Sequence, residues 1–225
     1  MHAFEYDGIS IKNRRSTNMD SMLLKERSIG GKNAYFMVVC DGVGSTEDGA
    51  YASRTAVHFL SDWLNWLPDA SCIGPRLQDA VQKVNLAILD QATQQQLNTA
   101  STLSALLLID DRFYIVHAGD SRIYGYRDGT LELLTHDHVE NGRLTSYIGR
   151  TENPELFYNE GSAVGMRFLL CSDGLYKRME PSLIQQELAQ LTKKNIKHSL
   201  QRMTQYVTER GESDNISIAV LISES

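Results

Sequence analysis

Four aspartates stand at the ends of predicted strands: Asp20 in NMDS, Asp41 in VVCDGVG, Asp173 in LLCSDGL and Asp214 in ESDNISIAV. A fifth, Asp120, lies in the turn AGDSR. Side chains at strand ends can meet at a common rim, where carboxylates repel one another unless cations neutralise them. Oxygen ligands without His or Cys favour hard cations such as Mg²⁺ or Mn²⁺. The five aspartates together predict a site for divalent cations.

Each aspartate taken alone also has a structural explanation, because Asp-Gly is a common turn pair and Asp can bond its own backbone in a turn. Two other motifs are weaker pointers to chemistry. Gly42-Val43-Gly44 lacks the following Lys-Ser or Lys-Thr of a phosphate-binding loop. His136 and His138 are either metal ligands or a solvated, hydrogen-bonded pair after a strand.

The spacing of apolar residues predicts the strands and helices that position these side chains. Short apolar or alternating runs predict strands over residues 3–12, 34–40, 102–109, 112–118, 122–127, 130–134, 166–171 and 216–222. Helical spacing predicts helices over residues 49–67, 75–96, 181–191 and 196–209. Residues 138–163 are polar and poorly periodic, which predicts a short loop or flap.

The order of these elements predicts an α+β fold of two packed antiparallel β-sheets flanked by helix pairs. Asp-Gly type turns between the central strands predict a meander. No internal repeat or Pro/Ser-rich linker interrupts the chain, so we expect a single domain over residues 1–225.

The composition argues against nucleic-acid-binding, disulfide-rich and membrane proteins. The formal net charge of −6 leaves no basic footprint, so nucleic acid is not an expected partner. The odd number of cysteines and the lack of a Cys-x-x-Cys pair argue against a disulfide framework or a zinc ribbon. Cys40 and Cys171 each end an apolar run and are expected to be buried free thiols. Without a signal-peptide core or a stretch of about 18 apolar residues, the protein is expected to be cytoplasmic and away from membranes.

The motifs follow one another in an order that covers nearly the whole chain. They are Arg15-Ser-Thr-Asn18-Met-Asp20, Asp41-Gly42-Val43-Gly44, Ser101-Thr102, Ala118-Gly119-Asp120-Ser121-Arg122, Leu134-Thr135-His136-Asp137-His138, Ser172-Asp173-Gly174 and Asp214-Asn215. This series resembles the protein phosphatase 2C family, in its bacterial type. The family fold is a β-sandwich flanked by helix pairs, in agreement with the fold predicted from the element order.

The resemblance implies a role for each acidic residue. Asp41 would bridge two ions of Mg²⁺ or Mn²⁺, with the Gly42 carbonyl as a further ligand. Asp173 and Asp214 would hold one ion of the pair. Asp20 would act nearby, directly or through ordered water.

The resemblance also implies a third ion and a phosphate contact. Asp120, with Asp173, matches positions that bind a third, weaker ion in bacterial relatives, so two or three ions are expected. Arg15 would hold the substrate phosphate, because a guanidinium fork suits two phosphate oxygens. A water that bridges two divalent ions can be hydroxide near neutral pH and attack phosphorus, which makes Arg15 and Asp41 the expected catalytic residues.

The implied function is that of a serine/threonine protein phosphatase: a monomer that acts on phosphorylated proteins and opposes a serine/threonine kinase. Three positions depart from the family pattern, and two of them, Met19 and the short segment after His138, motivate an alternative. Met19 stands where family members usually carry Glu, Val43 stands where some carry His, and the segment after His138 is short. The alternative is a catalytically weak pseudophosphatase that binds a phosphoprotein partner. An unrelated divalent-cation binder or hydrolase is a third hypothesis.

Overall fold

Two five-stranded antiparallel sheets form the centre of the structure, a computed structural model that describes residues 4–46 and 48–223. One sheet has the order β1 (Phe4–Ile11), β12 (Ile216–Ser223), β11 (Arg167–Cys171), β6 (Arg122–Arg127) and β7 (Thr130–Leu133). The other has the order β10 (Phe157–Ser162), β5 (Arg112–Ala118), β4 (Leu103–Ile109), β3 (Lys32–Cys40) and β2 (Ser21–Ile29). We call them the β12 sheet and the β3 sheet. A small hairpin pairs β8 (Val139–Glu140) with β9 (Arg143–Leu144).

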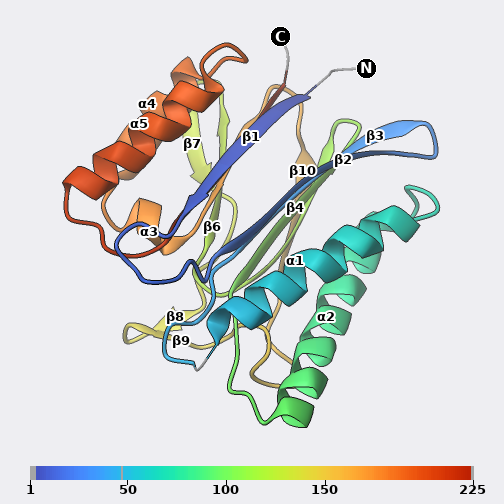
Figure 1. The fold of residues 1–225 in the computed structure, drawn as a ribbon. Coiled ribbons are helices and arrows are strands. Elements are labelled where there is room, and N and C mark those ends of the chain that lie inside the picture. Colours follow the sequence, from blue (N-terminus) through green and yellow to red (C-terminus); the bar gives the residue numbers. More distant parts are fainter. Residues whose placement is uncertain (1–3, 47, 224–225) are drawn as a thin grey trace.

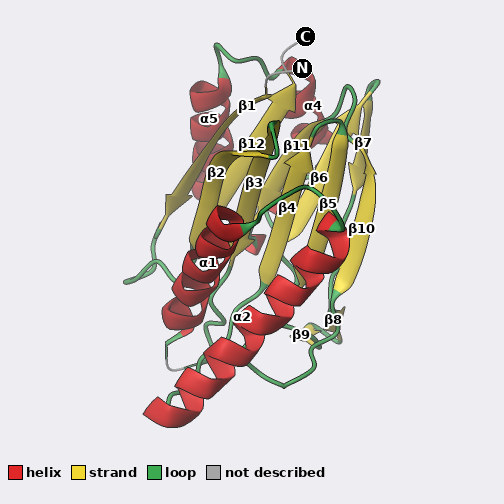
Figure 2. Cartoon of the chain, turned by 90° about the vertical axis from the view of Figure 1, so that its right-hand side faces the viewer, coloured by secondary structure: helices red, strands yellow, loops and turns green. Residues whose placement is uncertain are grey.

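Helices cover the outer faces of both sheets (Figures 1 and 2). The pair α1 (Gly49–Trp66) and α2 (Ile73–Gln95) lies against the β3 sheet. The helices α3 (Asp173–Tyr176), α4 (Pro181–Gln190) and α5 (Ile196–Glu209) lie against the β12 sheet. This arrangement confirms the predicted α+β sandwich. No helix among the described residues is long and apolar enough to cross a membrane.

Both faces of each sheet are buried, which explains why several strands are continuous apolar runs rather than alternating ones. In β3, Phe36 and Val38 face the α1–α2 layer, whereas Met37 and Val39 face the other sheet. The contact between the sheets includes an edge-to-face pair of aromatic rings from β5 and β11, Phe113 and Phe168, with centroids 5.5 Å apart. Because both faces of these strands are buried, the position of each strand is fixed, and so are the residues that follow its end.

Three predictions about the strands were wrong or incomplete. The loop predicted over residues 138–163 contains β10, which pairs with β5 and forms an edge of its sheet. The strand β2 was not predicted, and it forms the opposite edge of that sheet. Edge strands carry polar and charged side chains, so their apolar pattern is weak. The strand predicted to begin at Ala3 is β1, although Ala3 itself lies outside the described residues.

The predicted central meander was also wrong, because β5 and β6 belong to different sheets. The chain crosses from the β3 sheet to the β12 sheet through residues 119–121. An earlier crossing, residues 12–20, leads from β1 to β2. Both crossings lie at the end of the sandwich where β3 and β11 finish, because Cys40 pairs with Ser21 and Cys171 pairs with Arg122. The predicted site residues are therefore brought to one end.

Candidate active site

A pocket of about 120 Å³ at this end of the sandwich collects most of the predicted site residues. It is lined by Arg15, Asp41, Gly42, Asp120, Asp173 and Asp214, together with Met19, Val43, Gly44, Thr102 and Leu144. Asp20 is not among the lining residues, since its side chain is buried. The residues come from both sheets and from both crossings, so only the tertiary fold brings them together.

Asp41 directly follows β3 and has a tightly held backbone. Its N–H donates to the Thr102 hydroxyl (2.9 Å), and its carbonyl accepts from the Thr102 N–H (2.8 Å) and the Ser101 hydroxyl (3.0 Å). The Ser101-Thr102 motif therefore positions this aspartate. Burial, with the charges of Asp20 and Asp173, raises the pKa of Asp41 well above its ordinary value.

Asp20 lies behind the pocket and is only 6% exposed. Its Oδ2 accepts hydrogen bonds from the hydroxyls of Ser172 (2.8 Å) and Ser217 (2.7 Å), but its Oδ1 has no partner. Burial raises the pKa of Asp20 to about 6, although the two serine hydrogen bonds act in the opposite direction. Neither serine role is visible in the sequence, because the partners are remote along the chain.

Asp173 and Asp214 each face a cationic side chain. The Arg15 guanidinium donates to both carboxylate oxygens of Asp214, at 3.0 and 2.8 Å. Lys177, one helical turn after Asp173, donates to Asp173 Oδ2. Asp173 Oδ1 is buried and has no partner. The acidic residues are therefore only partly neutralised by the chain itself.

The donor set suits divalent cations. Buried polar atoms almost always have partners, yet Asp20 Oδ1 and Asp173 Oδ1 have none. Burial and the charge of Asp173 also raise the pKa of Asp120, to about 6. No group of three or more His, Cys, Asp or Glu side chains in the described part of the chain is already gathered as a ready-made metal site.

The glycines of the two Asp-Gly pairs serve a close approach of backbones rather than a turn. A Cβ on Gly42 would lie 2.5 Å from the carbonyl carbon of Gly49. A Cβ on Gly174, in α3, would lie 2.0 Å from the carbonyl oxygen of Asn215. Neither glycine has a positive φ. A side chain at either glycine would push the segments that carry Asp41, Asp173 and Asp214 away from their neighbours.

Asn215 holds the first crossing in place, a role that the sequence did not reveal. Its side-chain oxygen accepts from the Met19 N–H (2.8 Å), and its amide donates to the carbonyls of Lys12 and Thr17 (both 3.0 Å). The residue after Asp214 thus fixes the segment that carries Arg15.

The remaining motifs contact the crossing at residues 119–121 and hold it in place. Arg122 binds both carboxylate oxygens of Asp137, with the shorter contact at 2.7 Å, and its guanidinium lies 3.8 Å from the centre of the Tyr176 ring. His138 is buried, and its Nδ1 accepts from the Gly119 N–H at 3.1 Å. Of the two alternatives for His138, the structure therefore favours the hydrogen-bonded one.

His117 is buried next to this crossing and should make the folding stability depend on pH. Its ring stacks on His138 at 5.3 Å and bonds Ser104 (2.8 Å) and the Gly119 carbonyl (3.0 Å). Burial, and to a lesser degree His138, lowers the pKa of His117 to about 4. An unfolded chain binds this proton near pH 6.5. The unfolded state thus binds more protons between pH 6.5 and 4, and folding stability is lost as the pH falls through that window.

Because of the lowered pKa of His117, we expect the free energy of unfolding to fall by up to roughly 3 kcal/mol between pH 7 and pH 4. The free energy of unfolding in urea, measured at several pH values, tests this. Asp20 and Asp120, whose pKa values are raised, act in the opposite direction. The comparison is therefore between the pH slopes of the wild type and His117→Gln, and equal slopes would contradict the prediction.

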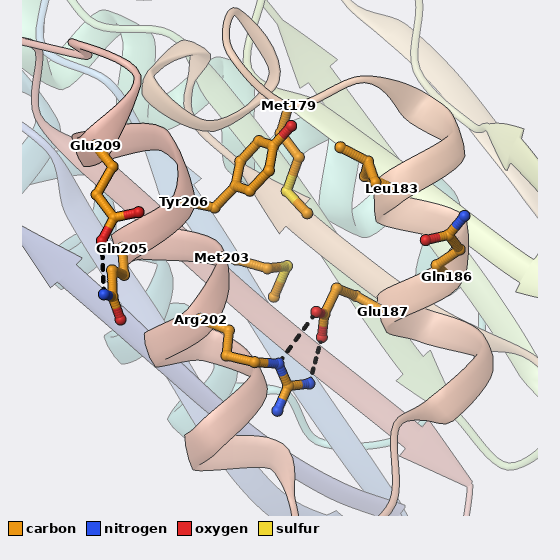
Figure 3. Close-up of a pocket in the computed structure, with 9 residues that line it drawn as sticks. All are labelled: Met179, Leu183, Gln186, Glu187, Arg202, Met203, Gln205, Tyr206 and Glu209. Carbon is orange, nitrogen blue, oxygen red and sulfur yellow. Dashed lines mark hydrogen bonds and ion pairs between the residues drawn. The ribbon is translucent and has the colours of Figure 1, made fainter.

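A second pocket, of about 280 Å³, lies between α4 and α5 (Figure 3). Met179, Leu183, Met203 and Tyr206 contribute apolar surface, and Arg202 pairs with Glu187 across the two helices at 2.7 Å. None of the predicted site residues lines it. Despite its larger volume, it offers no cluster of aspartates, so the chemistry is assigned to the smaller acidic pocket.

Comparisons with known proteins show which family this chain is similar to. A sequence profile of the family described as Protein phosphatase 2C matches residues 10–218. The serine/threonine protein phosphatase PstP of Mycobacterium tuberculosis is 28% identical over 229 positions, which cover 92% of this chain and 42% of PstP. The chain therefore spans less than half the length of that relative.

Solved structures show the same architecture. The protein PppA, described as a key regulatory component of T6SS in Pseudomonas aeruginosa, has a TM-score of 0.80 at 26% identity, over 98% of each chain. The serine/threonine phosphatase Stp1 of Staphylococcus aureus has a TM-score of 0.89, over 99% of this chain and 96% of Stp1. Its identity of 18% makes that likeness one of fold alone. Because the family profile covers nearly the whole chain, this chain belongs to the protein phosphatase 2C family.

Proposed function

We propose that this chain is a metal-dependent serine/threonine protein phosphatase that hydrolyses phosphoserine and phosphothreonine in proteins. Its family and the name of its relative PstP support the reaction class. The observation that carries the proposal is the acidic pocket itself, which Arg15 lines together with four aspartates and in whose wall the buried Asp173 Oδ1 has no partner. Nothing in the structure or the comparisons favours the alternative of a binding-only pseudophosphatase.

The proposed ligands are those that the resemblance implies. Asp41 would bridge two ions of Mg²⁺ or Mn²⁺, and the Gly42 carbonyl would be a further ligand. Asp173 and Asp214 would hold one ion of the pair, and Asp20 would act nearby. Bound divalent ions would supply charge neutralisation and increase the acidity of water. The raised pKa of Asp41 is consistent with this role, because a carboxylate repelled by its neighbours gains most from a cation.

Asp120 and Asp173 would form a third, weaker cation position. Burial, together with the charges of Asp173 and Asp137, raises the pKa of Asp120. A cation beside Asp120 would relieve this repulsion.

Arg15 would bind the substrate phosphate. Its side chain is 50% exposed, and exposed ion pairs contribute only about 0–1 kcal/mol, so the pair with Asp214 can open at little cost. The two guanidinium nitrogens that now contact Asp214 could then donate to two phosphate oxygens. Val43 cannot protonate the leaving oxygen, which would take its proton from water. Burial raises the pKa of the Cys40 and Cys171 thiols, so neither is suited to act as a nucleophile.

We further propose that residues 1–225 form one catalytic domain that acts as a monomer in the cytoplasm. Its substrates would be proteins phosphorylated by a serine/threonine kinase.

Hydrolysis of p-nitrophenyl phosphate tests the proposed function. We expect the purified chain to turn over this ester with Mn²⁺ or Mg²⁺ and to lose the activity with EDTA. The variant Asp173→Asn should be nearly inactive, because it removes a carboxylate that lies 13% exposed in the pocket wall. A phosphothreonine peptide should be hydrolysed in preference to a phosphotyrosine peptide. A folded wild type without turnover in either metal would refute the proposal.

A further inference from the structure

Lys177 is a cation that the family resemblance did not assign. It ends the short helix α3, four residues after Asp173, and its ammonium donates to Asp173 Oδ2. Although burial acts against it, the hydrogen bond to Asp173 and the charges of Asp173, Asp120 and Asp214 raise the pKa of Lys177. The side chain is about half exposed, so it can swing away into solvent without leaving a cavity.

The other cationic side chains near the pocket are already held by different acids. Arg15 forms its two hydrogen bonds with Asp214. Arg122 binds Asp137 and stacks on Tyr176. Lys177 is the cation whose charge lowers the pKa of Asp120, while Asp173 and Asp137 raise it. Among the described residues, Lys177 is thus the one placed to neutralise Asp120 and Asp173 together.

Asp173 divides its two oxygens between two environments. Oδ2 accepts from Lys177, whereas the buried Oδ1 has no partner. A cation that uses Oδ1 can bind while the Lys177 contact persists. A cation that uses Oδ2 and Asp120 must displace the ammonium from Oδ2.

We propose that the Lys177 ammonium competes with a divalent cation for Asp120 and Asp173, and so weakens the third cation position of this site. The inference rests on the proposed function, since it assumes that the site binds divalent ions. It assigns Lys177 a role in setting how many ions are bound at a given metal concentration. The residue is a positioning residue, not a catalytic one.

The test is a titration of the full chain with Mn²⁺. Binding is measured by calorimetry and by the electron paramagnetic resonance signal of free Mn²⁺. We expect Lys177→Met to bind the third ion at least about tenfold more tightly than the wild type, because one nearby positive charge has gone. Lys177→Arg should retain the weak third site. The double variant Lys177→Met/Asp120→Asn should lose the gain.

Lys83→Met provides a matched control. Lys83 forms the same i, i+4 pair with Asp79 on α2, with 62% and 60% of the two side chains exposed. It should leave Mn²⁺ binding unchanged. The proposal is overturned if Lys177→Met binds the third ion as the wild type does, or if Asp120→Asn does not cancel the gain. Two tightly bound ions with hydrolysis but no effect of Lys177 would refute this inference alone, whereas no Mn²⁺ binding by any variant would refute the proposed function as well.

Discussion

Asp41→Asn is expected to lower the turnover of p-nitrophenyl phosphate by roughly 10²- to 10³-fold at saturating Mn²⁺. Asparagine has almost the same size but no charge, so the two proposed ions would lose the carboxylate that bridges them. Thr102 and Ser101 bond only the backbone of residue 41, so the substitution leaves these contacts intact. Initial rates as a function of Mn²⁺ concentration measure both the turnover and the metal dependence.

The stability of this variant separates loss of a ligand from loss of the fold. Burial and neighbouring acids disfavour the charged form of Asp41, so a neutral residue should leave the protein in EDTA at least as stable as the wild type. Asp79→Asn, on the exposed side of α2, is the matched control for the turnover. Near-wild-type turnover of Asp41→Asn would refute the bridging role.

Gly174→Ala should destabilise the fold strongly, because the structure leaves no room for the added methyl group. The new Cβ would stand 2.0 Å from the Asn215 carbonyl oxygen, and neither backbone can move without displacing a strand or a helix. We expect a loss of about 3 kcal/mol in the free energy of unfolding, at the upper end for overpacking. Urea denaturation followed by fluorescence measures it.

The same substitution should weaken Mn²⁺ binding, because Asn215 holds the crossing that carries Arg15 and neighbours Asp214. Gly44→Ala is the control for stability, since its Cβ would meet only the Met19 methyl group, at 3.7 Å. If the free energy of unfolding of Gly174→Ala lies within about 0.5 kcal/mol of the wild-type value, the close approach has no energetic importance.

The sequence predicts best those elements whose residues are buried on two sides. The strands β5 and β6 and the helix α5 have the predicted bounds, and β3, β4 and β12 differ by a few residues. Their apolar content reflects the packing between sheets and helices. The order of the motifs is equally informative, because the family that it resembles is the one whose profile matches residues 10–218.

Other features depend on tertiary contacts that leave no local pattern. The edge strands β2 and β10 contain charged residues and were missed. The serines that bond Asp20 lie 152 and 197 positions away from it. The proximity of Lys177 to Asp120 depends on the crossing between β5 and β6. The glycines after Asp41 and Asp173 were interpreted as turn residues, although they permit close contact with another backbone segment.

The division of the acids between two sheets has a consequence for how the protein folds. Asp41 extends from the β3 sheet, whereas Asp173 and Asp214 flank strands of the β12 sheet. Neither sheet alone offers the full set, so a divalent ion cannot guide the early steps of folding. It can bind only after the sheets have docked, and its binding energy then adds to the barrier against their separation. Metal concentration should therefore control the lifetime of the folded chain more than the rate at which it forms.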